Sequence, residues 1–149
     1  CHDRLFEQQQ WTPKPLNDVF DFFSDVKNLE ELTPPLLNFR VVGKSTENIQ
    51  EGTKIDYKLK IRGVPAKWTS LITNWQPMTQ FADVQLKGPY AKWHHLHLFR
   101  SLAGGVLIED KVVYRLPFSR FGGNFLHWFI RKDVKTIFSY RRKRIKEWC

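Results

Sequence analysis

The sequence is poor in the residues that build several common kinds of functional site. It has two cysteines, Cys1 and Cys149, at opposite ends of the chain, and one methionine. A disulfide framework needs more cysteines than this. The sequence also contains no Gly-rich phosphate loop, no Gly-x-Ser-x-Gly elbow and no Cys-x-x-Cys pair. It therefore does not indicate a nucleotide-binding loop, a serine hydrolase or a disulfide oxidoreductase.

Long hydrophobic runs are also missing. No apolar run approaches the roughly 20 residues that a membrane-spanning helix needs, and the first residues lack the pattern of a secretory signal. We therefore expect a cytoplasmic protein without a transmembrane segment. The chain has 149 residues, of which 42% are hydrophobic, with 6 Trp and 12 Phe. This size and composition predict one folded domain, residues 1–149, with a core of its own.

The middle of the chain shows the period-two alternation of half-buried strands. In residues 53–62, Ile55, Tyr57, Leu59 and Ile61 alternate with charged residues. Gly63-Val64-Pro65 is expected to turn the chain, and Ala103-Gly104 to form a two-residue hairpin loop. We expect strands over residues 2–11, 39–43, 53–62, 67–75, 80–87, 91–102 and 106–116.

Helical spacing surrounds this strand region. Apolar residues recur every three or four positions in residues 16–23, and Ser24 is expected to cap a second short helix. After Gly122-Gly123, one long amphipathic helix is expected to run to the C-terminal end, with Asn124 as its cap. The order predicts an α+β fold: a curved antiparallel sheet of six or seven strands around the C-terminal helix, with a space between them.

The strand parities place polar side chains on the inner, concave face of the sheet. In residues 91–102, His95 and His97 alternate with Trp93 and Phe99, so they share the buried face. Counting back from the expected turns pairs His95 with Asp83 and His97 with Asp110 across neighbouring strands. The same face is expected to carry Tyr57, Ser70, Gln85, Val112 and Tyr114.

Three interpretations of this polar cluster stay open. The His–Asp pairs could form a satisfied internal network that fixes strand register. They could form the polar floor of a ligand cavity. They could also perform acid–base chemistry on a carbonyl compound, with His95, His97, Asp83, Asp110 and Tyr114 as the catalytic set. A metal held by His95, His97 and Asp110 is a weaker alternative, and we expect no metal and no cofactor.

Several short phrases support a family resemblance. They include Phe22-Phe23, Leu32-Thr33-Pro34-Pro35, Gly88-Pro89-Tyr90, the Trp93-x-His95-x-His97-x-Phe99 strand, Asp110 and the Ile137–Arg141 helix segment. Together with the element order, they resemble the START-like helix-grip (SRPBCC) superfamily, in its bacterial polyketide cyclase/dehydrase-like branch. Ser119 departs from the glycine usual in related sequences after the Leu-Pro-Phe phrase.

The resemblance implies that the protein binds a small hydrophobic or aromatic molecule, such as a lipid, polyketide or isoprenoid. The alternative is a cyclase or dehydratase that uses the same cavity without a cofactor. The expected ligand-binding residues are Tyr57, Trp68, Ser70, Phe81, Gln85, Trp93, Phe99, Val112, Phe129, Ile130 and Val134.

Positive charge gathers at the C-terminal end. The net charge is +9, and residues 121–149 hold eight Lys or Arg against two Asp or Glu. The simplest interpretation is the exposed face of a terminal helix, whose dipole favours cations there. The alternative is an interaction module that contacts an anionic membrane surface, or less readily nucleic acid, through Arg141, Arg142, Lys143 and Arg144.

Overall fold

The computed structural model describes residues 3–61, 63–115 and 123–148, and the side chains of residues 61 and 123–132 lie outside this description. The described chain begins with strand β1 (Arg4–Thr12), followed by helices α1 (Leu16–Phe23) and α2 (Val26–Glu31) and the short 3₁₀ helix η1 (Pro35–Leu37). The remaining elements are β2 (Arg40–Lys44), β3 (Lys54–Ile61), β4 (Val64–Gln76), β5 (Gln80–Lys87), β6 (Lys92–Leu102), β7 (Gly105–Arg115) and α3 (Gly123–Trp148).

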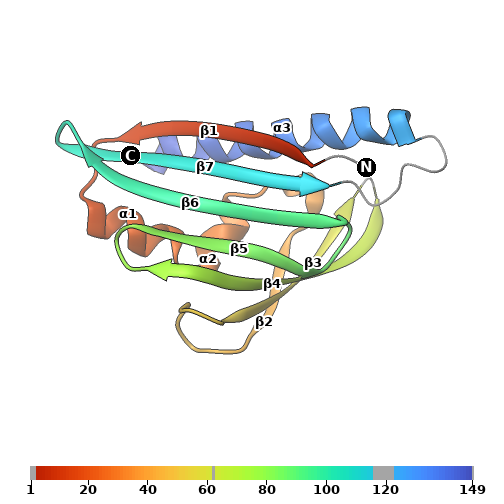
Figure 1. Ribbon diagram of the computed structural model, residues 1–149, viewed down its shortest axis with the longest axis horizontal. Helices are drawn as coiled ribbons and strands as arrows, with labels where there is room; N and C mark the ends of the chain where they lie inside the picture. The colour runs from red at the N-terminus through yellow and green to blue at the C-terminus, as the bar shows by residue number, and fades with distance from the viewer. Residues whose placement is uncertain (1–2, 62, 116–122, 149) are drawn as a thin grey trace.

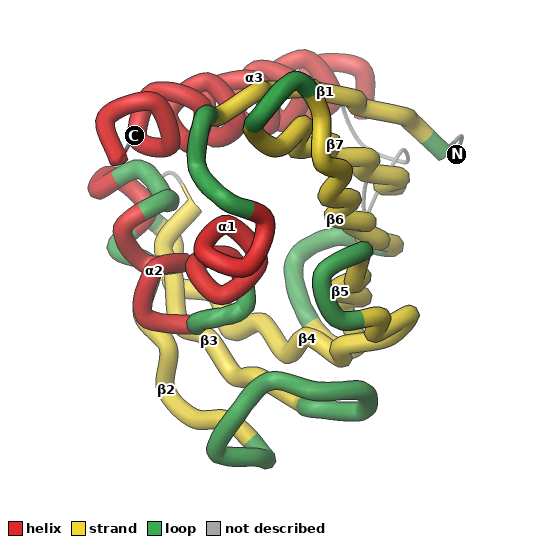
Figure 2. The backbone as a smooth tube through the Cα atoms, turned by 90° about the vertical axis from the view of Figure 1, so that its left-hand side faces the viewer, coloured by secondary structure: helices red, strands yellow, loops and turns green. Residues whose placement is uncertain are grey.

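The strands form one antiparallel sheet in the order β1-β7-β6-β5-β4-β3-β2, in which the first strand pairs with the last (Figure 1). The sheet curves around α1 and α2, and α3 runs along the β1 side of the curve (Figure 2). The expected α+β fold, with a curved sheet, a long C-terminal helix and two short helices after the first strand, is confirmed.

The register of the central hairpin follows from its turn. Ala103 and Gly104 have φ values of 50° and 79°, and positive φ at both central residues matches the twist of a two-residue hairpin. This turn pairs Phe99 with Ile108 and His97 with Asp110, as the sequence predicts. One face of each strand is therefore buried, and the functional side chains lie on that face.

Helix α3 buries one stripe of its surface. Val134, Phe138, Arg141 and Ile145 are all at most 5% exposed, and their spacing of three or four residues places them on one side of the helix. Side-chain amides of β1 attach the helix to the sheet edge, with Gln8 donating to the Phe138 carbonyl at 3.3 Å. Among the described residues, no helix is long and apolar enough to cross a membrane.

Two local predictions are wrong. Val64 and Pro65 belong to β4 rather than to a turn, because Ile61 already pairs with Val64. The second short helix is capped by Asp25, whose carboxylate accepts from the Lys27 amide at 3.0 Å. The Ser24 hydroxyl instead donates to the Phe20 carbonyl at the end of α1.

Candidate functional site: a cavity above a buried His–Asp network

Two histidines and two aspartates meet on the concave face. His95, His97 and Asp110 are buried, while the Asp83 side chain keeps 21% of its surface exposed. The sheet pairs Asp83 with His95 and His97 with Asp110, as the register predicts. Those directly opposite groups are neighbours at 3.7 Å and 3.6 Å, too far apart for hydrogen bonds.

The hydrogen bonds run along the diagonals instead. His95 Nε2 lies 2.8 Å from Asp110 Oδ1, and His97 Nε2 lies 2.8 Å from Asp83 Oδ2. The two imidazole rings stack at 3.7 Å between centroids. Each ring therefore lies between the two carboxylates, with one ring nitrogen near Asp83 and the other near Asp110.

Arg141 of α3 completes the network. Its Nη2 lies 3.3 Å from His97 Nδ1 and 3.3 Å from Asp110 Oδ1, and the guanidinium carbon sits 5.0 Å from the Phe23 ring centroid. The prediction that Arg141 belongs to an exposed basic end is wrong. The helix places it on the buried stripe, where it supplies the cation beside the buried Asp110 carboxylate.

The partners determine where the protons lie. A carboxylate only accepts, so each Nε2 carries the proton and donates to its aspartate. Arg141 only donates, so His97 Nδ1 accepts and the ring is neutral. Burial lowers the pKa of His97 to about 4, the charges of His95 and Arg141 add to this effect, and Asp83 opposes it. Both ring nitrogens of His97 are thus engaged within the protein.

Both aspartates are ionised. Burial alone would raise the pKa of Asp110, but Arg141 and the hydrogen bond from His95 outweigh it and hold the pKa well below the usual range. Burial likewise opposes ionisation of Asp83, and the hydrogen bond from His97 with the nearby positive charges lowers its pKa overall. Arg141 and the hydrogen bonds from the histidines thus keep both carboxylates ionised.

A cavity of about 160 Å³ lies directly above this network. Its polar lining comes from Thr33, Tyr57, Ser70, Asp83, His95, His97, Asp133 and Arg141. Its apolar walls include Leu29, Leu32, Leu37, Phe39, Leu59, Trp68, Tyr90, Trp93, Ile137 and Phe138. A smaller cavity of about 30 Å³ shares Asp83, His97 and Arg141 with it, so these side chains separate the two spaces. Burial raises the pKa of Tyr57 above its ordinary value, which keeps its hydroxyl protonated.

The structure brings some of the predicted ligand residues to the main cavity. Tyr57, Trp68, Ser70 and Trp93 line it, as do three members of the predicted catalytic set, His95, His97 and Asp83. Phe81 lines the smaller space and stacks on His97 at 4.4 Å. The predicted Phe129 and Ile130 lie outside the described side chains.

Other predicted site residues do not line either cavity. Phe99, Val112 and Val134 are packed into the hydrophobic core. Gln85 turns toward the β5–β6 loop, where its amide exchanges hydrogen bonds with the backbone of Tyr90 at 2.7 and 3.1 Å. Tyr114 is 4% exposed and packs against Trp93 and Tyr90, which separates it from the cavity. Asp110 lies behind the histidines and acts on them rather than on a ligand.

Three side chains of the network also lie close enough together to be considered as metal ligands. Ligand atoms of Asp83, His95 and His97 lie within 4.8 Å of one another, so the carboxylate available to an ion is Asp83 rather than the predicted Asp110. The proton of His97 sits on Nε2, however, because Arg141 donates to Nδ1. A metal at His97 Nε2 would displace the proton shared with Asp83, and a metal at Nδ1 would displace the Arg141 guanidinium. The geometry therefore favours a hydrogen-bonded network over a metal centre.

Comparison with known proteins places the chain in a family. Residues 12–138 match a family model described as polyketide cyclase / dehydrase and lipid transport. The chain belongs to this family. No curated protein matches its sequence. The predicted polyketide cyclase/dehydrase-like membership is confirmed, and the START-like fold is shared with a solved START superfamily protein.

Solved structures share the fold of this polyketide cyclase/dehydrase family member. A START superfamily protein from Mycobacterium smegmatis is 8% identical, with a TM-score of 0.71, covering 97% of this chain and 99% of that one. An aromatase/cyclase from Streptomyces sp. R1128 is 14% identical, with a TM-score of 0.76, covering 95% and 90%. A nucleoside-diphosphate sugar epimerase from Corynebacterium glutamicum is 25% identical, with a TM-score of 0.60, covering 75% of this chain and 25% of that longer one.

Proposed function

We propose that the protein binds one small hydrophobic or aromatic molecule, of the lipid, polyketide or isoprenoid class, between the curved sheet and α3. The observation that carries this proposal is a cavity of about 160 Å³ with mostly apolar walls and a few polar side chains. Apolar walls with a few convergent polar groups are typical of small-molecule sites. An apolar cavity of about 150 Å³ holds a benzene-sized molecule, so the space suits an aromatic ring or a short acyl chain.

Two neighbouring leucines of η1 allow a matched test. Leu37 lines the cavity and is 7% exposed, whereas Leu36 is 69% exposed. We expect Leu37→Trp to fill the cavity and abolish binding of 2-naphthol and short fatty acids, measured by native mass spectrometry and thermal shift. Leu36→Trp should bind them as the unchanged protein does. If no apolar compound binds the unchanged protein, or if both variants bind equally, the proposal fails.

A second candidate function, a cyclase or dehydratase, is favoured by the free nitrogen of His95. Asp110 holds Nε2, while Nδ1 lies 3.7 Å from Asp83 and has no hydrogen bond at that distance. An imidazole oriented by a carboxylate is a competent general base. Nδ1 would take a proton from carbon next to a ligand carbonyl. The resulting imidazolium would lie between two carboxylates, which compensate its charge.

The enzyme proposal predicts that the two histidines differ. His95→Gln should abolish proton exchange between D₂O and the carbon next to the carbonyl of a bound ligand, followed by NMR, while binding survives. General base catalysis supplies a rate gain of about 10²–10⁴-fold, so a loss of that order is expected. His97→Gln should retain most of the exchange. Equal exchange in the unchanged protein and His95→Gln would exclude this mechanism and leave the binding function standing.

A further inference from the structure

A row of positive charge crosses the convex face of the sheet at the β2–β3–β4 end. Arg40 pairs with Lys58, and Lys58 pairs with Lys67, so three cations stand directly opposite one another on exposed positions. Like charges in opposite cross-strand positions destabilise a sheet. We call Arg40, Lys58 and Lys67 the basic row. A further lysine, Lys60, occupies the next outward position of β3.

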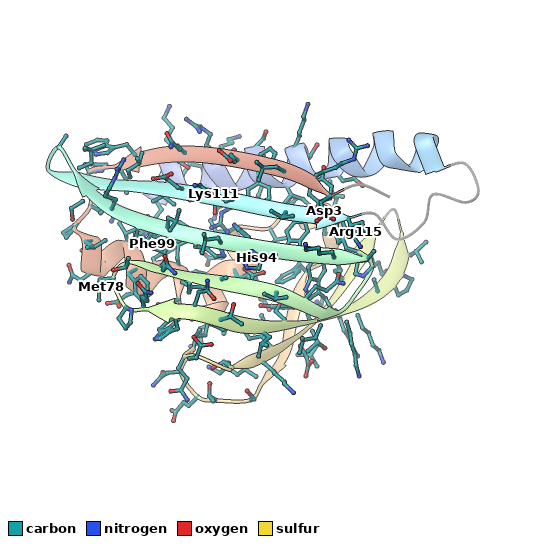
Figure 3. The ribbon with its side chains drawn as sticks, viewed as in Figure 1. Asp3, Met78, His94, Phe99, Lys111 and Arg115 are labelled. Carbon is teal, nitrogen blue, oxygen red and sulfur yellow. The ribbon has the colours of Figure 1, made fainter. Side chains whose placement is uncertain are left out.

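At the other end of the same face, the cations form ion pairs with a carboxylate. Near the start of β1, Asp3 accepts from Lys92 at 3.0 Å and from Arg115 at 2.8 Å, and Figure 3 shows Asp3 beside Arg115. In the described part of the chain, the basic row has no such ion pair. The nearest carboxylate along β3, that of Asp56, accepts from the Thr69 hydroxyl at 2.7 Å. No described ion pair therefore offsets the repulsion within the row.

An exposed apolar side chain lies beside the basic row. Val42 of β2 is 57% exposed and stands two positions after Arg40 in the alternating exposure pattern of that strand. The inner face of β3 and β4 supplies Tyr57, Leu59 and Trp68 to the cavity. The charged corner is thus the outer wall of the ligand cavity.

We propose that this corner docks on an anionic lipid surface, with the basic row against the headgroups and Val42 in the interface. Surface lysines and arginines attract anionic lipids by about 1 kcal/mol each, and apolar side chains add buried area at the same boundary. The docking rests on the proposed function in one respect: the ligand would be an amphiphile exchanged with that surface.

Nucleic acid fits the corner less well. A surface that binds single strands combines basic residues with exposed aromatic rings on which bases stack. The large exposed hydrophobic residue described beside the row is aliphatic, Val42. The aromatic side chains of β3 and β4 that are described face inward, where Tyr57 and Trp68 line the cavity. A basic row without exposed rings beside it suits the headgroups of an anionic bilayer better than nucleic acid.

Vesicle sedimentation of the full chain tests the proposal. We expect binding to vesicles of phosphatidylcholine with about 30% phosphatidylglycerol, weak binding to pure phosphatidylcholine, and loss of binding at about 1 M salt, where charges are screened within a few ångströms. Arg40→Gln/Lys58→Gln/Lys67→Gln should weaken binding on the order of a hundredfold. Its melting temperature should stay equal or rise, because repulsion is removed.

A matched control carries the same change of charge elsewhere. Lys135, Lys143 and Lys146 are exposed on α3, and Lys143 and Lys146 belong to the basic end that the sequence singles out. Lys135→Gln/Lys143→Gln/Lys146→Gln should keep most of the vesicle binding. Equal losses in both triple variants would show attraction by net charge alone, and a loss confined to the α3 variant would assign contact to the helix. Either result overturns the proposal.

Two further outcomes also decide it. If the unchanged protein ignores the anionic vesicles, the corner does not dock on lipid. If neutralising the basic row abolishes binding of a single-stranded oligonucleotide but leaves vesicle binding intact, the row serves nucleic acid. Cavity binding of 2-naphthol is measured in solution without vesicles, so a failed docking experiment leaves the proposed ligand site standing, and a failed ligand screen leaves vesicle docking testable.

Discussion

Two groups of charged residues differ in whether their charges are paired. On the concave face, Arg141, Asp110 and Asp83 are packed among two imidazoles, and every charge has a partner within 3.3 Å. On the convex face, the basic row repeats one sign across three strands. Water screens the outer charges, so their repulsion costs little. The interior offers no such screening, and an unpaired charge there is expensive.

The largest expected effect comes from breaking the buried group. Arg141→Met leaves Asp110 buried without its cation, and we expect the free energy of unfolding in urea to fall by about 3–5 kcal/mol. The double variant Arg141→Met/Asp110→Asn should recover a substantial part of this loss, because it removes the stranded charge. A loss below about 1 kcal/mol in the single variant would mean that the network is not energetically coupled.

Low pH should reduce the contribution of the same buried group to the free energy of unfolding. The pKa of His97 is about 4 in the folded protein and near 6.5 when unfolded, so between these values the unfolded chain binds the extra proton. The free energy of unfolding therefore falls as pH drops through this window, by up to about 1.4 kcal/mol per pH unit.

Below this pH range, protonation of Asp83 and Asp110 lowers the stability further. Asp83 and Asp110 keep lowered pKa values when folded, so the unfolded chain protonates them first, near 3.8, and stability falls further. Urea unfolding at several pH values measures both ranges. His97→Gln should flatten the upper range and leave the lower one. A slope of opposite sign between pH 4 and 6.5 would contradict the neutral assignment of His97.

A change of charge in the basic row should raise the stability of the protein instead of lowering it. Lys58→Glu places an anion between Arg40 and Lys67, and we expect a gain of about 0.5–1 kcal/mol in unfolding free energy at low salt. The gain should shrink as salt is added. Destabilisation at low salt would show that the three cations do not face one another in solution.

The smallest effect is expected at an exposed position away from both groups. Lys143→Gln on α3 should change the free energy of unfolding by no more than about 0.5 kcal/mol, because the side chain is exposed. Chemical unfolding side by side with Arg141→Met measures the contrast between two cations only two positions apart. A cost comparable to that of Arg141→Met would remove the distinction between the buried and exposed faces of the helix.

Strand parity was enough to predict most of the fold and part of the site from the sequence. The alternation of β6, fixed by Trp93 and Phe99, was enough to place His95 and His97 on the buried face, and the two-residue turn at Ala103 was enough to set Asp110 opposite His97. The diagonal hydrogen bonds could not be predicted, because they depend on how far stacked rings lean along the strands.

The cavity walls needed contacts between distant elements. Leu29, Leu32 and Leu37 come from α2 and the segment after it, where no alternation indicates which side chains will cover a ligand. Arg141 did leave a signal, since it occupies an apolar position in the helical repeat of α3. A cation within an apolar stripe indicates a buried partner. The repeat does not say which carboxylate that partner is.

The chain's own order of residues determined the antiparallel sheet, the long helix and the inward direction of two imidazoles, because those features follow from periods of two and 3.6 residues and from short turns. Tertiary packing alone decided that Arg141 meets Asp110, that Tyr114 and Val112 are core, and that a cavity remains above the histidines. Local periodicity sets which way a side chain points, whereas the space it meets depends on segments distant in the sequence, as where Leu29 and Arg141 line one cavity.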